Sequence, residues 1–87
     1  MVKREIEIVN ELGLHASPAA KLVRLAAQFE SEVFITYANT KINAKSIMGV
    51  MMLAVEKGGR ITIEVEGEDE NELLQELLYL ISSGFGE

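Results

Sequence analysis

Histidine occurs only once in this chain, inside the run Gly13-Leu14-His15-Ala16-Ser17-Pro18-Ala19-Ala20. Apolar residues at helical spacing begin directly after this run, which places His15 at the predicted start of a helix. The first turn of a helix carries unpaired backbone N–H groups and the positive end of the helix dipole, and both favour an anion such as phosphate. A neutral imidazole is a good nucleophile toward phosphorus. The run has the chemistry of a phosphoryl-acceptor site, although a lone histidine before a helix can also be an ordinary loop residue.

Three segments of the chain resemble the HPr family, the small histidine phosphocarriers of the bacterial sugar phosphotransferase system. The run around His15 is similar to that family's active-site motif, Gly-Leu-His-Ala-Arg-Pro-Ala. The segment Lys45-Ser46-Ile47-Met48-Gly49-Val50-Met51 is similar to its regulatory-serine segment, and Gly84-Phe85-Gly86-Glu87 resembles the ends of family members. The similarity extends over essentially the whole chain in one register. It implies a single HPr-like phosphocarrier domain over residues 1–87.

The resemblance implies a role for each residue around the predicted helix start. His15 is the expected phospho-acceptor, and Nδ1 is the ring nitrogen that the family uses. The backbone N–H groups of Ala16 and Ser17 would be the nearest helix-end donors to the phosphoryl oxygens. Pro18 suits the first turn, where an N–H has no intrahelical partner. Transfer between two proteins then needs a positioned ring, an in-line partner and these donors.

Ser17 departs from the family motif, in which the matching residue is arginine. Arginine supplies a charge-assisted fork of donors, whereas a serine hydroxyl supplies one neutral donor. Ser17 followed by Pro18 is also typical of a helix N-cap, and capping is the simpler interpretation. The sequence leaves two consequences open. One is a carrier with a less stabilised phosphohistidine, for which Arg24 is the nearest cation along the chain. The other is a variant with altered partners or slow transfer.

Two apolar features are expected to flank His15. One is a stripe on the first helix, spaced i, i+4, i+8 and i+11, that consists of Ala16, Ala20, Arg24 and Ala27. The other is a methionine-rich short helix, and methionines form adaptable docking surfaces as well as cores. The family docks through this second segment. The predicted partner contacts are Ala20, Arg24, Ala27, Ile47, Met48 and Met51. Met52 and Leu53 are predicted to turn inward.

Ser46 has two interpretations. It precedes the short helix, so an N-cap role is sufficient to explain it. In many family members the matching serine is phosphorylated by a dedicated kinase. A phosphate on Ser46 would place a charge of about −2 beside the docking residues and would repel partners without refolding the domain.

Hydrophobic periodicity predicts the strands that support these segments. Alternation of apolar and polar residues predicts half-buried strands over Val2–Val9, 33–37 and 61–65, with a shorter strand around Ile42. The inward residues of the last long strand are Ile61, Ile63 and Val65.

Three helices complete the pattern. The first is predicted from Pro18, with an apolar face of Ala19, Leu22, Val23, Ala26 and Phe29. The second follows Ser46 and ends at about Leu53. The third is predicted to start with a cap at Asp69, completed by Glu72, and to stop at Gly84. Its predicted buried stripe is Leu73, Leu74, Leu77, Leu80 and Ile81.

This order of elements, βαββαβα, predicts an α+β fold with a mostly antiparallel sheet covered on one face by helices. The pattern leaves the strand order open, and a ferredoxin-like order fits the same elements. Resemblance to HPr implies the order 1-4-2-3, an open-faced two-layer sandwich.

Composition excludes several classes of protein. With no cysteine and one histidine, the 87 residues offer neither disulfides nor enough ligands for a zinc site. The net charge of −6 argues against a nucleic-acid partner. The N-terminal residues lack the apolar stretch of a signal peptide, and no apolar run approaches the roughly 18 residues of a membrane span. We therefore expect a cytoplasmic protein without cofactor or metal and without membrane insertion.

The leading hypothesis is a monomeric phosphocarrier rather than an enzyme. It would receive a phosphoryl group on His15 from an upstream carrier of the Enzyme I type and pass it to sugar-specific proteins of the EIIA type, with a serine kinase/phosphorylase as a further possible partner. One alternative is a regulatory or nitrogen-branch paralogue that acts by docking. Another is a ligand-binding regulatory domain on a ferredoxin-like sheet. A small hydrolase ranks last, because the sequence offers no acid–base set beside His15.

Overall fold

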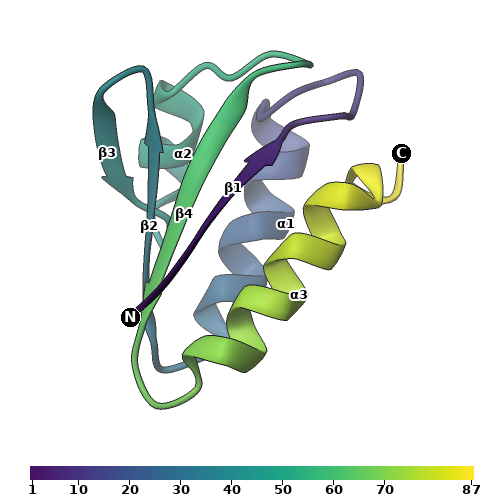
Figure 1. The fold of residues 1–87 in the computed structure, drawn as a ribbon. Coiled ribbons are helices and arrows are strands. Elements are labelled where there is room, and N and C mark those ends of the chain that lie inside the picture. The colour runs from purple at the N-terminus through teal and green to yellow at the C-terminus, as the bar shows by residue number, and fades with distance from the viewer.

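The computed structural model describes residues 1–87 and follows the predicted order of elements (Figure 1). The strands are β1 (Val2–Glu7), β2 (Glu32–Tyr37), β3 (Thr40–Asn43) and β4 (Arg60–Glu66). The helices are α1 (Ala16–Ala27), α2 (Ile47–Met52) and α3 (Glu70–Ser82), and a 3₁₀ turn over Gly84–Gly86 follows α3.

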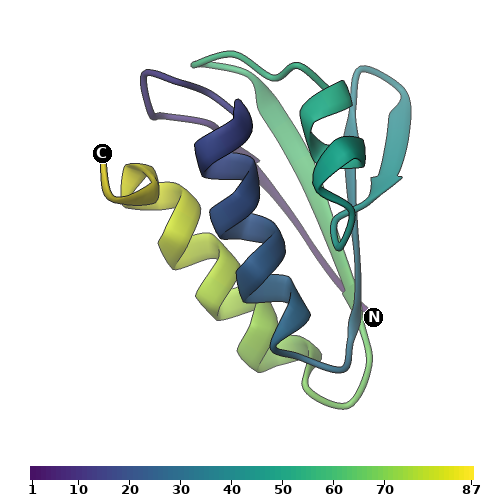
Figure 2. The same cartoon turned by 180° about the vertical axis from the view of Figure 1, so that it is seen from behind.

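The four strands form one antiparallel sheet in the order β1-β4-β2-β3. In β4, which lies between β1 and β2, Ile61 is opposite Ile6 of β1 and Ile63 is opposite Ile35 of β2. Figure 2 shows α1 and α3 side by side across one face of the sheet, with α2 beside β2 and β3. The order 1-4-2-3 and the open-faced sandwich are therefore confirmed, and the ferredoxin-like order is not adopted.

The core lies between this sheet and the helices. The inward residues of β4 are fully buried, as the strict alternation predicts. The helices cover them with Leu22, Ala26, Leu73, Leu77 and Ile81. Complete burial of a leucine or isoleucine side chain stabilises the fold by about 1.5–3 kcal/mol. This buried layer therefore gives the loops at the edge of the sheet a stable base.

Two predicted boundaries need correction. Strand β1 ends at Glu7 rather than Val9, although Ile8 is still held in place because its N–H donates to Gly59 O at 2.8 Å. Helix α1 begins at Ala16, two residues before the predicted start, and ends at Ala27, so Phe29 lies beyond it. The earlier start changes the position of Ser17 in the helix, with consequences for the site.

The predicted capping box at the start of α3 is not formed. Asp69 is the N-cap residue, but its carboxylate makes no cap bond and instead accepts the backbone N–H groups of Glu30 (2.9 Å) and Ser31 (3.0 Å) and the Ser31 hydroxyl. Glu70 rather than Glu72 turns back, and its Oε1 accepts the Gly67 N–H at 3.1 Å. Asp69 therefore ties the segment after α1 to the start of α3.

The rest of α3 follows the prediction with one exception. Leu73, Leu74, Leu77 and Ile81 are buried, whereas Leu80 is only half-buried because it faces a groove beside α1. Gly84 follows the helix with φ of +72°, the left-handed conformation for which glycine is favoured at a helix end.

Asp69 generates a testable stability prediction. The Ser31 hydroxyl and the backbone N–H of Glu30 hold the pKa of Asp69 below its ordinary value. A lowered folded-state pKa contributes stability above the unfolded-state value of about 4, and that stability is lost as the pH falls through the folded-state pKa. We expect Asp69→Asn to lower Tm by several degrees at neutral pH and by less at pH of about 3 in thermal unfolding followed by circular dichroism. Glu72→Gln, which removes an exposed carboxylate from the same helix, is the control and should leave both values unchanged.

Candidate functional site

His15 is the N-cap residue of α1, with extended backbone (φ −77°, ψ −173°) and a side chain that makes no cap hydrogen bond. Its side chain is 54% exposed. Within the first turn, Pro18 has no N–H and Ala19 donates its own to His15 O at 2.9 Å. Ala16 and Ser17 are therefore the first-turn residues whose N–H groups lack an intrahelical partner. The helix end presents two backbone donors beside an accessible imidazole.

Ser17 is the second residue of the helix rather than its N-cap. The N-cap interpretation of Ser17 is wrong, because the helix starts at Ala16 and His15 takes the cap position. The Ser17 residue is exposed and its hydroxyl makes no hydrogen bond within the protein. The hydroxyl is thus left available at the same end of the helix as the imidazole.

A close approach of two loops fixes the place of His15. The Leu14 N–H donates to Val55 O at 2.9 Å, so the chain before His15 runs beside the chain before Glu56. Gly13 has φ of +64°, and a Cβ on it would collide with the Val55 carbonyl oxygen. Only glycine allows both the left-handed conformation and this approach. Glycine at position 13 is therefore a packing requirement of the fold.

Glu56 is a site residue that the sequence analysis missed. Its Oε2 lies 3.4 Å from His15 Nε2, and its side chain is 73% exposed. A second pair joins the same two loops, because Lys57 Nζ lies 2.5 Å from Glu11 Oε1. This hydrogen bond and the Lys57 charge lower the pKa of Glu11, and the same hydrogen bond and the Glu11 charge raise the pKa of Lys57. The separation of 41 residues between His15 and Glu56 carries no local signal, so only the three-dimensional structure brings them together.

The C-terminal turn braces the loop that precedes His15. Asn10 is buried, and its Nδ2 donates to Gly13 O (2.9 Å) and to Glu87 Oε2 (2.8 Å). Lys21 Nζ donates to Phe85 O at 2.6 Å, and the Phe85 side chain is buried in the core. The resemblance of the last four residues to family members thus has a structural counterpart in these contacts.

Helix α2 presents an apolar surface as predicted, with one correction. Ser46 is its N-cap, and the Ser46 Oγ accepts the Gly49 N–H at 3.2 Å. Val50 and Leu53 are buried, whereas Met48 and Met52 are 64% and 77% exposed. The expectation that Met52 turns inward is wrong, because helical spacing places it on the same outer face as Met48. Ile47 and Met51 are also exposed, at 39% and 38%.

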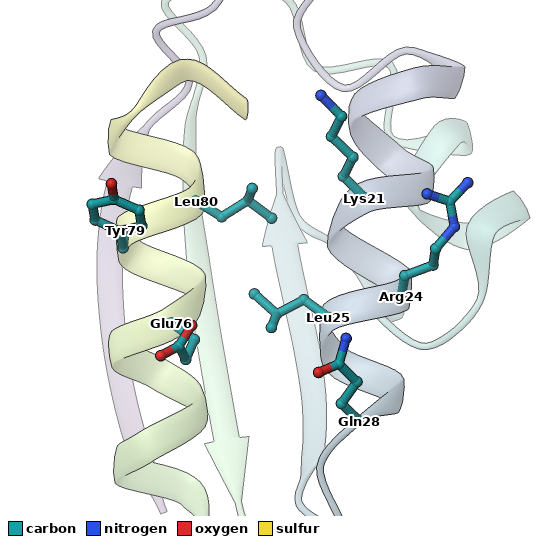
Figure 3. Close-up of a pocket in the computed structure, with 7 residues that line it drawn as sticks. All are labelled: Lys21, Arg24, Leu25, Gln28, Glu76, Tyr79 and Leu80. Carbon is teal, nitrogen blue, oxygen red and sulfur yellow. The ribbon is translucent and has the colours of Figure 1, made fainter. Parts of the chain in front are cut away.

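The stripe on α1 lies next to α2, and the two helices are in contact. Arg24 and Ala27 are exposed and Ala20 is half-buried. Arg24 also borders a groove of about 300 Å³ between α1 and α3, but its side chain points to the side of α1 away from α3 (Figure 3). Leu25 and Leu80 point toward one another across that groove. The guanidinium of Arg24 makes no ion pair within the chain, so it is available to an anionic partner.

The structure holds neither a group of metal ligands nor a membrane-spanning helix. No three His, Asp or Glu side chains are grouped so as to hold a metal ion. None of the helices has the length and apolar character needed to cross a membrane.

Comparison with known proteins gives one family. Residues 2–83 match the family described as PTS HPr component phosphorylation site. The chain is 49% identical over 87 residues to phosphocarrier protein HPr of Neisseria meningitidis serogroup A, covering all of this chain and 98% of that protein. It superposes on the crystal structure of HPr-C-His from Thermoanaerobacter tengcongensis with a TM-score of 0.97 and 47% identity, covering 100% and 98% of the two chains. Crh from Bacillus subtilis, described as a swapped, intertwined dimer, is 43% identical with a TM-score of 0.77 over 97% of each chain.

Proposed function

The chain belongs to the HPr family, and on that basis we propose that it is a single-domain cytoplasmic phosphocarrier whose acceptor is His15. The phosphoryl group would come from a phosphoenolpyruvate-dependent upstream carrier of the Enzyme I type and go to a sugar-specific protein of the EIIA type. The observation that carries this proposal is the exposed His15 ring at the start of α1, beside the free N–H groups of Ala16 and Ser17. The chain transports the group and performs no reaction on a small molecule.

Phosphoryl transfer requires only a nucleophile and hydrogen-bond donors from this chain. Nδ1 of His15 attacks the phosphorus in line, the N–P bond of the donor phosphohistidine breaks, and its electron pair returns to the donor ring. The Ala16 and Ser17 N–H groups and the helix dipole stabilise the incoming dianion, by about 0.3–1 kcal/mol for an exposed helix end. Transfer to the downstream acceptor is the same in-line displacement in the opposite direction. The acceptor attacks the phosphorus, the N–P bond to Nδ1 of His15 breaks, and its electron pair returns to the His15 ring.

His15→Ala tests the acceptor. The ring is exposed, so we expect the variant to keep the native Tm and to lose all acid-labile, base-stable phosphate after incubation with the upstream carrier and phosphoenolpyruvate. Undiminished labelling of the folded variant would place the acceptor elsewhere.

Variants at Ser17 test how well the helix end stabilises the phosphoryl group without a cation. The Ser17 hydroxyl is the one side-chain donor that this position offers, whereas arginine would add a charge-assisted fork. We expect Ser17→Arg to slow spontaneous phosphate loss or to speed transfer by about tenfold, the equivalent of one regained charge-assisted bond of ~1.4 kcal/mol. Ser17→Ala is the matched variant that removes only the hydroxyl. Identical rates in all three proteins would mean that the backbone donors or the partner already supply what arginine offers.

The proposed docking surface consists of Ala20, Arg24, Ala27, Ile47, Met48 and Met51. Its support is that α1 and α2 are in contact, that four of the six are exposed apolar or small residues, and that Arg24 has no partner in the chain. Exposed apolar residues beside a transfer site are typical of an interface. The exposure of Met52 extends this surface beyond the sequence prediction.

Met48→Glu tests the docking surface. A carboxylate in the centre of an apolar contact must be desolvated without a partner, so we expect at least a tenfold loss of affinity for the upstream carrier in isothermal titration calorimetry, with little change in Tm. Tyr79→Glu is the matched control, because Tyr79 is 74% exposed on α3 and should tolerate the same change without effect on affinity. Equal affinities for the two variants would remove α2 from the interface.

A regulatory role through Ser46 is the second candidate. It is favoured by the exposed position of Ser46 at the N-terminus of α2, directly before the docking residues. Phosphorylation by a serine kinase would place charge at that surface and would block docking. A protein that binds partners through this surface but transfers no phosphoryl group would be a regulatory or nitrogen-branch paralogue. A monomer is the form we propose for both roles.

A further inference from the structure

Glu56 is the one titratable side chain that touches His15. The contact joins Oε2 to Nε2 at 3.4 Å, at the long end of hydrogen-bond distances. The Leu14–Val55 hydrogen bond holds the backbone directly before each of the two residues, and so keeps them close to one another. Ala54, directly before Val55, has φ of +53°, and this left-handed residue turns the chain from α2 toward His15.

The surrounding charges leave this contact to Glu56 alone. Glu11 and Lys57, on the same two loops, are paired with each other. Lys21 is held by Phe85 O, and Arg24 lies more than two turns along α1. The carboxylate of Glu87 accepts the Asn10 Nδ2–H, and α2 carries no charged residue.

We propose that Glu56 is a positioning residue for His15, an inference that rests on the proposed phosphocarrier function. Its carboxylate accepts the Nε2–H of the ring. In a neutral imidazole one nitrogen carries the proton and the other carries the lone pair, so a fixed acceptor at Nε2 leaves the lone pair on Nδ1. Glu56 thereby selects the nitrogen that reacts.

Glu56 also acts on the charge of the ring during transfer. When Nδ1 forms its bond to phosphorus, Nε2 keeps its proton and the ring becomes positive. When the N–P bond breaks toward an acceptor, the electron pair returns to Nδ1 and the ring becomes neutral again. The carboxylate stabilises the positive ring in both transition states relative to a neutral ring, as the buried aspartate does for the histidine of a serine-protease triad. Here both groups are exposed, so the effect is smaller.

This role opposes the one that the family arginine plays. An arginine at position 17 would stabilise the bound phosphoryl oxygens, whereas Glu56 places a negative charge near them and favours the protonated ring, from which phosphate leaves more easily. With serine at position 17, the backbone N–H groups of the helix end oppose that charge, and no side-chain cation is paired with it. The Glu56 charge therefore makes the phosphohistidine release its group faster than it would without that charge.

The test compares native protein, Glu56→Gln and Glu11→Gln. Each is phosphorylated chemically with potassium phosphoramidate, which requires no partner protein, and the single histidine makes the site unambiguous. The phosphorylated nitrogen is identified by ¹⁵N and ³¹P NMR, and phosphate release is followed from about pH 5 to about pH 9, the range over which imidazoles titrate. Glu56→Gln keeps the size of the side chain and removes its charge. Glu11→Gln removes a charge from the same loops without touching His15.

We expect the native protein to carry phosphate on Nδ1 and, at the alkaline end, to release it about two- to fivefold faster than Glu56→Gln, the range for an exposed ion pair. The two profiles should converge at the acidic end, where the ring is protonated in both. Glu11→Gln should follow the native profile. Phosphate on Nε2 of the native protein, superimposable profiles for native and Glu56→Gln, or an equal shift in Glu11→Gln would overturn the proposal. Because no upstream carrier takes part, a failure of the carrier reaction in the His15 experiment would be a separate result.

Discussion

The hydrogen bond from Leu14 N–H to Val55 O is the constraint on which the site depends. It holds two loops in contact although they are 41 residues apart in sequence, and it places the start of α1 next to the end of the loop after α2. The approach is possible only because position 13 lacks a Cβ. His15 and the N–H donors of α1 follow Leu14 on one loop, and Glu56 follows Val55 on the other. Asn10 and the C-terminal turn hold the first loop from behind.

The electrostatics of this arrangement are those of a carrier that must give its group away. A helix end attracts a phosphoryl group weakly when it is exposed to water, and the exposed Ser17 hydroxyl adds only a neutral donor. A strong cation at position 17 would hold the phosphoryl group more tightly and would lower its tendency to leave. A shuttle between two proteins needs the phosphorylated state to be neither a trap nor too short-lived. In the carrier that we propose, backbone donors on one side of the ring and a carboxylate on the other would provide this balance.

The sequence predicted the features that depend on local periodicity, and it missed those that depend on contacts between distant residues. The alternation in β4 and the spacing in α3 each correspond to one buried face, so they could be read directly from residue types. The short α2 allowed two assignments for Met52, because six residues do not define a face as clearly as twelve do. Asp69 looked like a local cap, but its carboxylate bonds Ser31 and Glu30, whose approach depends on how α1 packs on α3. Ser17 was misread because Pro is tolerated throughout a first turn, so Ser-Pro alone does not fix where a helix begins. Glu56 had no sequence signal at all.

The distribution of charge suits the proposed docking to more than one partner. The net charge is −6, yet α2 has no charged residue and α1 has only Lys21 and Arg24. No carboxylate side chain lies on α1 or α2, although Glu56 contacts His15 before α1 and Glu76 lines the groove between α1 and α3. An uncharged surface of alanine and methionine loses little hydration free energy when a partner covers it, and the flexible methionine side chains can adapt to surfaces of different shape. On the proposed docking surface, the guanidinium of Arg24 would orient an anionic partner, and the shortage of other charged contacts there would favour rapid exchange of partners over tight binding.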